Sequence, residues 1–228
     1  SPFVAGARLL ALGHDVQCVD LNIHAWQEPL TQSLVAAADI VGVSLTGAPD
    51  VPQTRRLIKE IAKIAPQATV VLGGQTIERL TPEQFSRIFP AGVRQIASDE
   101  DLAKLLKCQV TDLPSPYTVP LAPLWARLDE RSLRTYLQNE MTLFVSQGCQ
   151  FTCSYCAASK EQKETFRNPQ VFESDLRWLA AKAREYGHKT IRFYATSLDF
   201  FQNPDAVAVY LDILARVRAD SGLDIRTR

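Results

Sequence analysis

The sequence has no excess of charge of either sign, because 25 lysine and arginine residues stand against 25 aspartate and glutamate residues. This balance gives no support for nucleic acid as the main partner, since such proteins carry a basic surface. No stretch approaches the ~20 apolar residues that a membrane-spanning helix needs, and no charged-then-apolar leader opens the printed sequence. There is also no internal repeat and no low-complexity tract. The remaining composition, 46% hydrophobic and 22% charged, is typical of a globular protein and argues against disorder.

Cysteine is scarce and unevenly placed. The chain has five cysteines, an odd number, and three of them lie within eight residues of one another. Such a layout is poor for a disulfide framework and good for binding metal. The other two, Cys18 and Cys108, are expected as a small apolar strand residue and a helix-end residue. We therefore expect a reducing, cytoplasmic setting.

Helix and strand signals alternate over residues 1–110, which we predict to form one domain. Residues 2–12 have a helical pattern, and residues 14–20 alternate apolar with polar side chains as a strand does. Short apolar runs over 40–45 and 69–72 predict two buried strands with a helix between them. Strands that alternate with helices indicate a parallel sheet covered on both faces.

A linker and a second unit are expected after this domain. Four prolines fall between residues 112 and 123, so residues 111–138 are predicted to be a proline-rich, partly extended linker. Residues 139–228 show strand, helix, strand, helix and the start of a third strand, which is the beginning of a β/α barrel. Three strands are too few to close a barrel, so we expect this chain to be a fragment of a longer protein.

The most informative pattern is a set of three cysteines on a predicted loop after the strand at 142–146. Cys149, Cys153 and Cys156 have the spacing Cys-x3-Cys-x2-Cys. Three thiolates this close can each bind one iron of a cubane cluster. The fourth iron is then open to chelate an amine and a carboxylate, and S-adenosylmethionine carries both groups. Cleavage of that molecule gives a reactive radical, so the reaction needs a closed, dry cavity such as the mouth of a barrel.

Two other kinds of metal site are alternatives. A zinc knuckle would need a fourth ligand, and the candidates, Cys108, His188 and His24, are all more than thirty residues from the motif. A plain electron-transfer cluster normally has four cysteine ligands.

The cysteine motif, with Gly148 before its first cysteine and Tyr155 before its last, resembles the signature of the radical S-adenosylmethionine superfamily. The resemblance covers residues 141–228. It implies that the three cysteines bind a 4Fe-4S cluster and that Tyr155 packs near the adenine of S-adenosylmethionine. It also implies a reducing electron donor of the flavodoxin or ferredoxin type.

Many members of this superfamily carry a glycine-rich or acidic motif after the second strand, where the methionine amino group docks. That place has no glycine here, and Thr196, Ser197 or Asp199 could serve instead. A strand end capped by hydroxyl groups is the alternative. Arg167 resembles a basic residue that many members place after the cluster loop, and the alternative for it is a solvated loop arginine.

Small residues lie at the ends of the two predicted strands of the first domain: Ser44 and Thr46 at one, Gly73 and Gly74 at the other. In this order, ahead of the cysteine motif, they resemble the cobalamin-binding domain of the cobalamin-dependent radical subgroup. The resemblance implies that the four residues leave room for the nucleotide tail of the corrin beside the sheet. The alternative for the glycines is that they only allow a positive φ.

The sequence therefore predicts a two-domain α/β protein. An N-terminal Rossmann-like parallel sheet of the cobalamin-binding type is followed by the start of a radical S-adenosylmethionine β/α partial barrel. By resemblance the reaction is methyl transfer to an unactivated carbon, or another radical reaction, on a small natural-product-like or lipid-like molecule. One alternative is a radical enzyme whose N-terminal domain does not bind cobalamin. The other is a zinc-bound, non-catalytic interaction module.

Overall fold

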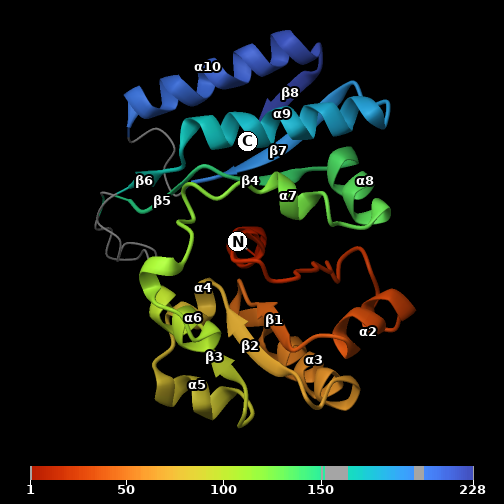
Figure 1. Cartoon of the computed structure of the whole chain (residues 1–228), viewed down its shortest axis with the longest axis vertical. Helices are drawn as coiled ribbons and strands as arrows, with labels where there is room; N and C mark the ends of the chain where they lie inside the picture. The colour runs from red at the N-terminus through yellow and green to blue at the C-terminus, as the bar shows by residue number, and fades with distance from the viewer. Residues whose placement is uncertain (1, 150, 152–163, 198–202, 228) are drawn as a thin grey trace. The chain divides into compact units, whose positions relative to one another are not determined.

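Figure 1 shows the computed structural model of the chain, which describes residues 2–149, 151, 164–197 and 203–227. The chain forms two compact units, one of Ser1–Pro2 with Val19–Leu113 and the other of Phe3–Cys18 with Pro114–Arg228. Each unit has its own hydrophobic core and its own parallel sheet.

The first unit is built on three parallel strands in the order β1-β2-β3. They are β1 (Ile40–Ser44), β2 (Thr69–Gly73) and β3 (Arg94–Gln95). The two strands predicted from apolar runs are thus confirmed. Ser44 lies directly opposite Gly73, so β1 and β2 end at the same level of the sheet.

Short helices surround this sheet, with α2 and α3 on the side of β1 and α5 and α6 on the side of β3 (Figure 1). Their bounds, with two 3-10 turns, are α2 (Pro29–Ala36), η1 (Ala48–Asp50), α3 (Val51–Ile64), α4 (Gln75–Glu78), α5 (Pro82–Ile88), α6 (Asp99–Leu106) and η2 (Val110–Asp112). α5 begins with a capping box formed by Thr81 and Gln84. Ser98 caps the start of α6, and its hydroxyl accepts a hydrogen bond from the amide of Asp101.

The core of the first unit contains buried side chains of α3, α4, α5 and the sheet. Ile58 and Ile61 are about one helical turn apart on α3. Both are at most 4% exposed, as are Leu72 of β2 and Leu45, which directly follows β1. Burying an aliphatic side chain of this size stabilises a fold by about 1.5–3 kcal/mol. The helical spacing in the sequence therefore identifies the face of α3 that covers the sheet.

The strand expected over residues 14–20 is not formed. The alternation in this stretch reflects burial without strand pairing: Val16 and Cys18 pack against the core of the second unit, whereas Asp15 is exposed and pairs with Arg127. Burial of every second side chain gives the same pattern in any extended segment, so the prediction was wrong about the backbone.

The second unit contains three parallel strands in the order β4-β7-β8 and a separate two-stranded antiparallel ribbon, β5-β6. The parallel strands are β4 (Met141–Phe144), β7 (Thr190–Thr196) and β8 (Asp224–Thr227). The ribbon consists of β5 (Ser146–Gln147) and β6 (Thr165–Phe166). The order of the three parallel strands and of the two long helices between them is the one that the sequence predicts, whereas the β5-β6 ribbon was not predicted. Closure into a barrel stays a prediction.

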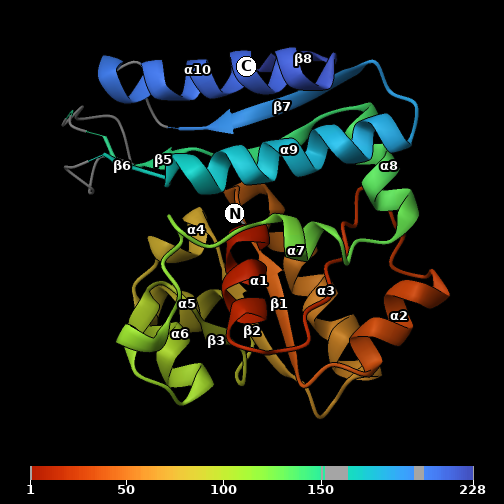
Figure 2. The ribbon, with the colours of Figure 1, turned by 45° about the horizontal axis from the view of Figure 1, so that its top comes forward.

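The helices of the second unit are α1 (Pro2–Ala11), α7 (Ala122–Trp125), α8 (Glu130–Gln138), α9 (Pro169–Glu185) and α10 (Pro204–Ser221). α9 joins β4 to β7 through the ribbon, α10 joins β7 to β8, and the two helices pack against each other (Figure 2). Buried Phe172 on α9 meets Phe193 of β7 and Tyr210 of α10 edge-on. No helix in the described ranges is long and apolar enough to cross a membrane.

The proline-rich stretch contains no strand, and its later part is more helical than expected. Pro123 lies in the first turn of α7, where proline is tolerated because the first amides of a helix have no partner. Asp129 then caps α8 by accepting a hydrogen bond from the amide of Ser132 at 3.0 Å. The second half of the predicted linker is therefore structured.

The N-terminal helix α1, which the sequence predicts, packs into the core of the second unit. Phe3 meets Tyr136 edge-on with ring centroids 5.7 Å apart. A Cβ on Gly6 would lie 2.8 Å from a methyl carbon of Leu124, so glycine allows the helix to come close. The Arg8 side chain also donates a hydrogen bond to the carbonyl of Pro114 at 2.7 Å.

Candidate cofactor sites

The four residues expected at a cobalamin site lie together at the carboxyl ends of β1 and β2. Ser44 is opposite Gly73, and the amide of Leu45 donates to the carbonyl of Gly73 at 2.8 Å. The carbonyl of Thr46 accepts a hydrogen bond from the hydroxyl of Thr76 at 3.0 Å. The side chains of Ser44 and Thr46 are exposed, which leaves them available to a ligand at this edge.

The two glycines at the end of β2 are glycine for different reasons. Gly74 has φ +103°, and a Cβ there would lie 2.7 Å from the carbonyl oxygen of Leu45, so the fold itself requires glycine. Gly73 has no such backbone demand, and the nearest atom to its added Cβ would be the carbonyl oxygen of Ile96 at 3.5 Å, an ordinary contact. Of these two residues, only Gly73 could be replaced by a residue with a small side chain without disturbing the fold, so its lack of a side chain calls for another explanation, such as a bound ligand.

Gly42, in the middle of β1, lies on the same face of the sheet as Ser44, although the sequence did not single it out. It lies two residues before Ser44 on β1, so both face the same side of the sheet, and both are exposed. An added Cβ would make only an ordinary contact with Val71, at 3.7 Å. Glycine inside a strand often marks close approach of another group, and that was the signal that could have identified it.

The second site surrounds Cys149, which follows β4 and β5. Gly148 has φ +94°, so a positive-φ turn directly precedes the cysteine. The backbone amide of Phe151 donates to the Cys149 sulfur at 3.5 Å, and such amide contacts are typical of metal-bound thiolates. Cys153, Tyr155 and Cys156 lie outside the described residues. Within the described residues, no three histidine, cysteine, aspartate or glutamate side chains come together as a metal site.

Two of the candidate fourth ligands for zinc are poorly placed. His188 lies just before β7, at the opposite end of the strand from Ser197. That strand spans about 20 Å, which the three residues from Ser146 to Cys149 cannot bridge. His24 is only 3% exposed, and its Nδ1 lies 3.0 Å from a carboxylate oxygen of Glu28.

A polar cluster of three side chains includes Ser146, which lies three residues before Cys149. The Ser146 hydroxyl donates to Oε1 of Glu164 at 2.7 Å and lies 2.8 Å from the Ser197 hydroxyl. The Ser197 hydroxyl is in turn 3.4 Å from the same Glu164 oxygen. Oε2 of Glu164 is buried and has no hydrogen-bond partner among the described residues. Of the three predicted residues at this place, Asp199 lies outside the described residues. Ser197 joins the cluster, whereas the Thr196 hydroxyl donates to the carbonyl of Leu143 at 3.3 Å.

Glu164 could not be found from the sequence, because strand pairing brings it to the site. Ser146 and Phe166 are opposite each other in the antiparallel ribbon, and the amide of Arg167 donates to the carbonyl of Val145 at 2.8 Å. Ser197 arrives at the same point because β4 and β7 are parallel neighbours. The cluster therefore depends on three segments that are distant in sequence.

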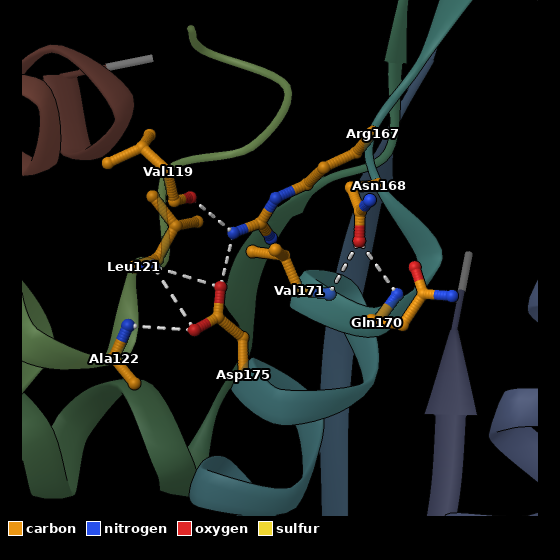
Figure 3. A network of polar contacts seen from close by, with 8 residues as sticks. All are labelled: Val119, Leu121, Ala122, Arg167, Asn168, Gln170, Val171 and Asp175. Carbon is orange, nitrogen blue, oxygen red and sulfur yellow. Dashed lines mark hydrogen bonds and ion pairs between the residues drawn. The ribbon is translucent and has the colours of Figure 1, made fainter. Parts of the chain in front are cut away.

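Arg167 is not a solvated loop residue, since it is 1% exposed. Figure 3 shows its guanidinium between Asp175 of α9 and the carbonyl of Val119, to which it donates at 2.9 Å. Asp175 also accepts hydrogen bonds from the amides of Leu121 and Ala122, at 2.9 Å each. The residue that follows the cysteine loop is thus fixed to α9 and to the proline-rich stretch.

Comparison with known proteins supports the expectation of a cobalamin-binding domain in the first part of the chain. Residues 4–93 match the family model of the B12-binding domain. A solved structure of OxsB, described as a cobalamin-dependent S-adenosylmethionine radical enzyme with aqua-cobalamin and S-adenosylmethionine bound, is similar with a TM-score of 0.67 and 14% identity. The likeness covers 99% of this chain and 35% of that one, so the chain spans about a third of the OxsB length. At this identity it shows the fold alone. No curated protein matches the chain.

The B12-binding match includes β1, β2 and the edge formed by Ser44, Thr46, Gly73 and Gly74. Gly42 and Gly73 have no side chain, although neither backbone conformation nor nearby atoms require glycine there. This is consistent with a ligand that lies against these strands. The match also includes α1, although that helix packs with the second unit.

Proposed function

We propose that the chain is part of a cobalamin-dependent radical S-adenosylmethionine enzyme. The observation that carries the proposal is the order of two features. A segment matching the B12-binding domain is followed by Cys149, Cys153 and Cys156 directly after the first strand of a second parallel unit.

In the first unit, Ser44, Thr46 and Gly73 would hold cobalamin. The hydroxyl groups of Ser44 and Thr46 are exposed at these strand ends, and Gly73 has no side chain to cover its backbone. A large ligand could therefore approach closely. Bound cobalamin would supply a methyl group. Gly74 would act indirectly, because it allows the turn that brings α4 up to Leu45.

In the second unit, the three cysteines would hold a 4Fe-4S cluster. The bound cluster, reduced by a flavodoxin-type or ferredoxin-type donor, would supply the electron that cleaves S-adenosylmethionine. Tyr155 would pack near the adenine. Ser197 would border the cofactor, and Thr196, bonded to the backbone, would shape the strand end.

The reaction supported best is methyl transfer to an unactivated carbon, or a related radical reaction, on a small natural-product-like or lipid-like molecule. The same proposal places the protein in the cytoplasm, where thiolates stay reduced.

Metal and cobalamin content test the proposal. Anaerobic reconstitution should give about four iron and four sulfide per chain, with absorption near 400 nm. Cys153→Ala should abolish iron uptake, and hydroxocobalamin should bind with a change in its visible spectrum. One zinc per chain without iron uptake would contradict the radical chemistry. Iron uptake without cobalamin binding by the folded protein would favour a radical enzyme with a non-binding N-terminal domain.

A further inference from the structure

The segment 74–80, which follows β2 and contains α4, is firmly attached to the rest of the first unit. The side-chain amide of Gln95 in β3 donates hydrogen bonds to the carbonyls of Ile77 and Leu80, at 2.9 Å and 2.8 Å. The side chain of Ile77 is fully buried in the core. Both contacts hold the segment on the side of β3, so it provides a fixed support for whatever it touches on the side of β1.

On the side of β1, the segment is joined to the loop 45–50 through Thr76. The Thr76 hydroxyl donates to the carbonyl of Thr46 at 3.0 Å, and its amide donates to the carbonyl of Leu45 at 3.4 Å. Leu45 is 1% exposed and is held by the core, whereas residues 46–50 are all half-buried or exposed. Little packing therefore holds Thr46, and the hydroxyl of Thr76 fixes its backbone.

We propose that Thr76 is a positioning residue for cobalamin. Its hydroxyl holds Thr46 beside Ser44 and level with Gly73, so that these residues are in place before the ligand arrives. This inference rests on the proposed function. A loop that is already ordered loses less conformational entropy when it binds, so the hydroxyl should increase affinity without touching the ligand.

The effect on binding should be separable from the effect on stability. The hydrogen bond from Thr76 to Thr46 lies in an exposed part of the structure, and water can replace it at little cost when the hydroxyl is removed. Because Gln95 and Ile77 keep the segment 74–80 in place, the loss of this bond should loosen the loop that carries Thr46 and leave the remainder of the first unit as it is.

Titration of the full chain with hydroxocobalamin, followed by its visible spectrum, tests this role. Thr76→Val removes the hydroxyl from a side chain of nearly the same size and should weaken binding about three- to tenfold, with a nearly unchanged thermal midpoint. Thr76→Ser keeps the hydroxyl and should bind almost as the unchanged protein does.

Thr81→Val is the matched control, because it also removes a threonine hydroxyl from the first unit. That hydroxyl accepts a hydrogen bond from the amide of Gln84 and caps α5. Its loss should lower the thermal midpoint and leave the affinity for hydroxocobalamin unchanged.

Hydrogen exchange of the cobalamin-free protein gives a second readout. Thr76→Val should speed exchange at the amides of residues 45–50 and not at those of β2. Unchanged exchange in this loop, equal affinity of the Thr76→Val and unchanged proteins, or the same loss of affinity in Thr76→Ser or Thr81→Val would overturn the role of Thr76 and leave the proposed function intact. Failure of the unchanged, folded protein to bind hydroxocobalamin would overturn this role together with cobalamin binding.

Discussion

Gly73 is the last residue of β2 and Gly74 follows it, and the backbone makes different demands on them. The positive φ of Gly74 and the nearby Leu45 carbonyl exclude a side chain there, whereas Gly73 has room for a small one. Gly74→Ala is thus a probe of folding, and Gly73 is the position at which ligand binding can be tested separately.

We expect Gly74→Ala to lower the free energy of unfolding of the first unit by about 2 kcal/mol, from backbone strain. Gly73→Ala should change it little, and the bulkier Gly73→Val should weaken hydroxocobalamin binding with a nearly unchanged thermal midpoint. Thermal unfolding and titration followed by the visible spectrum measure the two effects. Equal binding by the Gly73→Val protein would remove this edge from the cobalamin site.

The raised pKa of Tyr210 makes the stability of the folded protein depend on pH above about 10. Burial raises its pKa from 10 to about 12, Arg167 opposes this shift and Glu164 adds to it. Its hydroxyl donates to the carbonyl of Arg167, so only the protonated form suits the folded state. The stabilisation is complete below pH 10, where the unfolded chain also keeps the proton, and it is lost as the pH rises towards 12.

The difference in unfolding free energy between the unchanged protein and Tyr210→Phe should therefore stay constant up to about pH 10. It should then fall by up to about 2 kcal/mol towards pH 12. Urea unfolding at several pH values measures this difference, and a flat difference over that range would show that the tyrosine titrates normally.

At the scale of elements, the buried pair of Arg167 and Asp175 joins three segments: the end of the ribbon, α9 and the stretch from Val119 to Ala122 (Figure 3). Both side chains are fully buried. A buried pair contributes little over an apolar substitute, but removal of one partner leaves the other charge uncompensated.

Asp175→Asn should accordingly destabilise the second unit by about 3 kcal/mol, and hydrogen exchange should become faster at the amides of Leu121 and Ala122. Glu173→Gln, on the same helix, removes an exposed carboxylate that pairs with Arg177 and Arg216 and should have a much smaller effect. Similar losses for both variants would argue against a special role for the buried pair.

At the scale of the whole molecule, the chain does not divide at one point into two halves. The second unit takes Phe3–Cys18 from the beginning of the chain, while Val19–Leu113 forms the first unit with a separate core. A substitution in α1 should therefore lower the stability of the second unit and leave that of the first unchanged.

Phe3→Ala should lower the stability of the second unit by about 3 kcal/mol, whereas Leu72→Ala should affect the first unit by a similar amount. Hydrogen exchange followed by mass spectrometry can assign each loss, because peptides from β2 and from β7 report on different cores. Faster exchange in β2 after Phe3→Ala would contradict this division.

Much of the architecture follows from local pattern. Apolar runs identified β1 and β2, and helical spacing identified α3, α9 and α10, because each pattern depends on neighbours within one element. The cysteine spacing predicts a metal motif on the same local basis. The alternation over residues 14–20 misled for the same reason: it reports which side chains are buried, and not whether a neighbouring strand is there to pair with.

The sequence by itself determined the parallel α/β class, the main strands and long helices of both units, and most of the residues of the candidate cobalamin site. Only the tertiary structure decided that α1 packs with the second unit, that Gly74 is required by the Leu45 carbonyl, that Arg167 is buried, and that Glu164 meets Ser146 and Ser197. These features depend on contacts between segments far apart in the chain, and side-chain periodicity carries no information about which distant segment will be the partner.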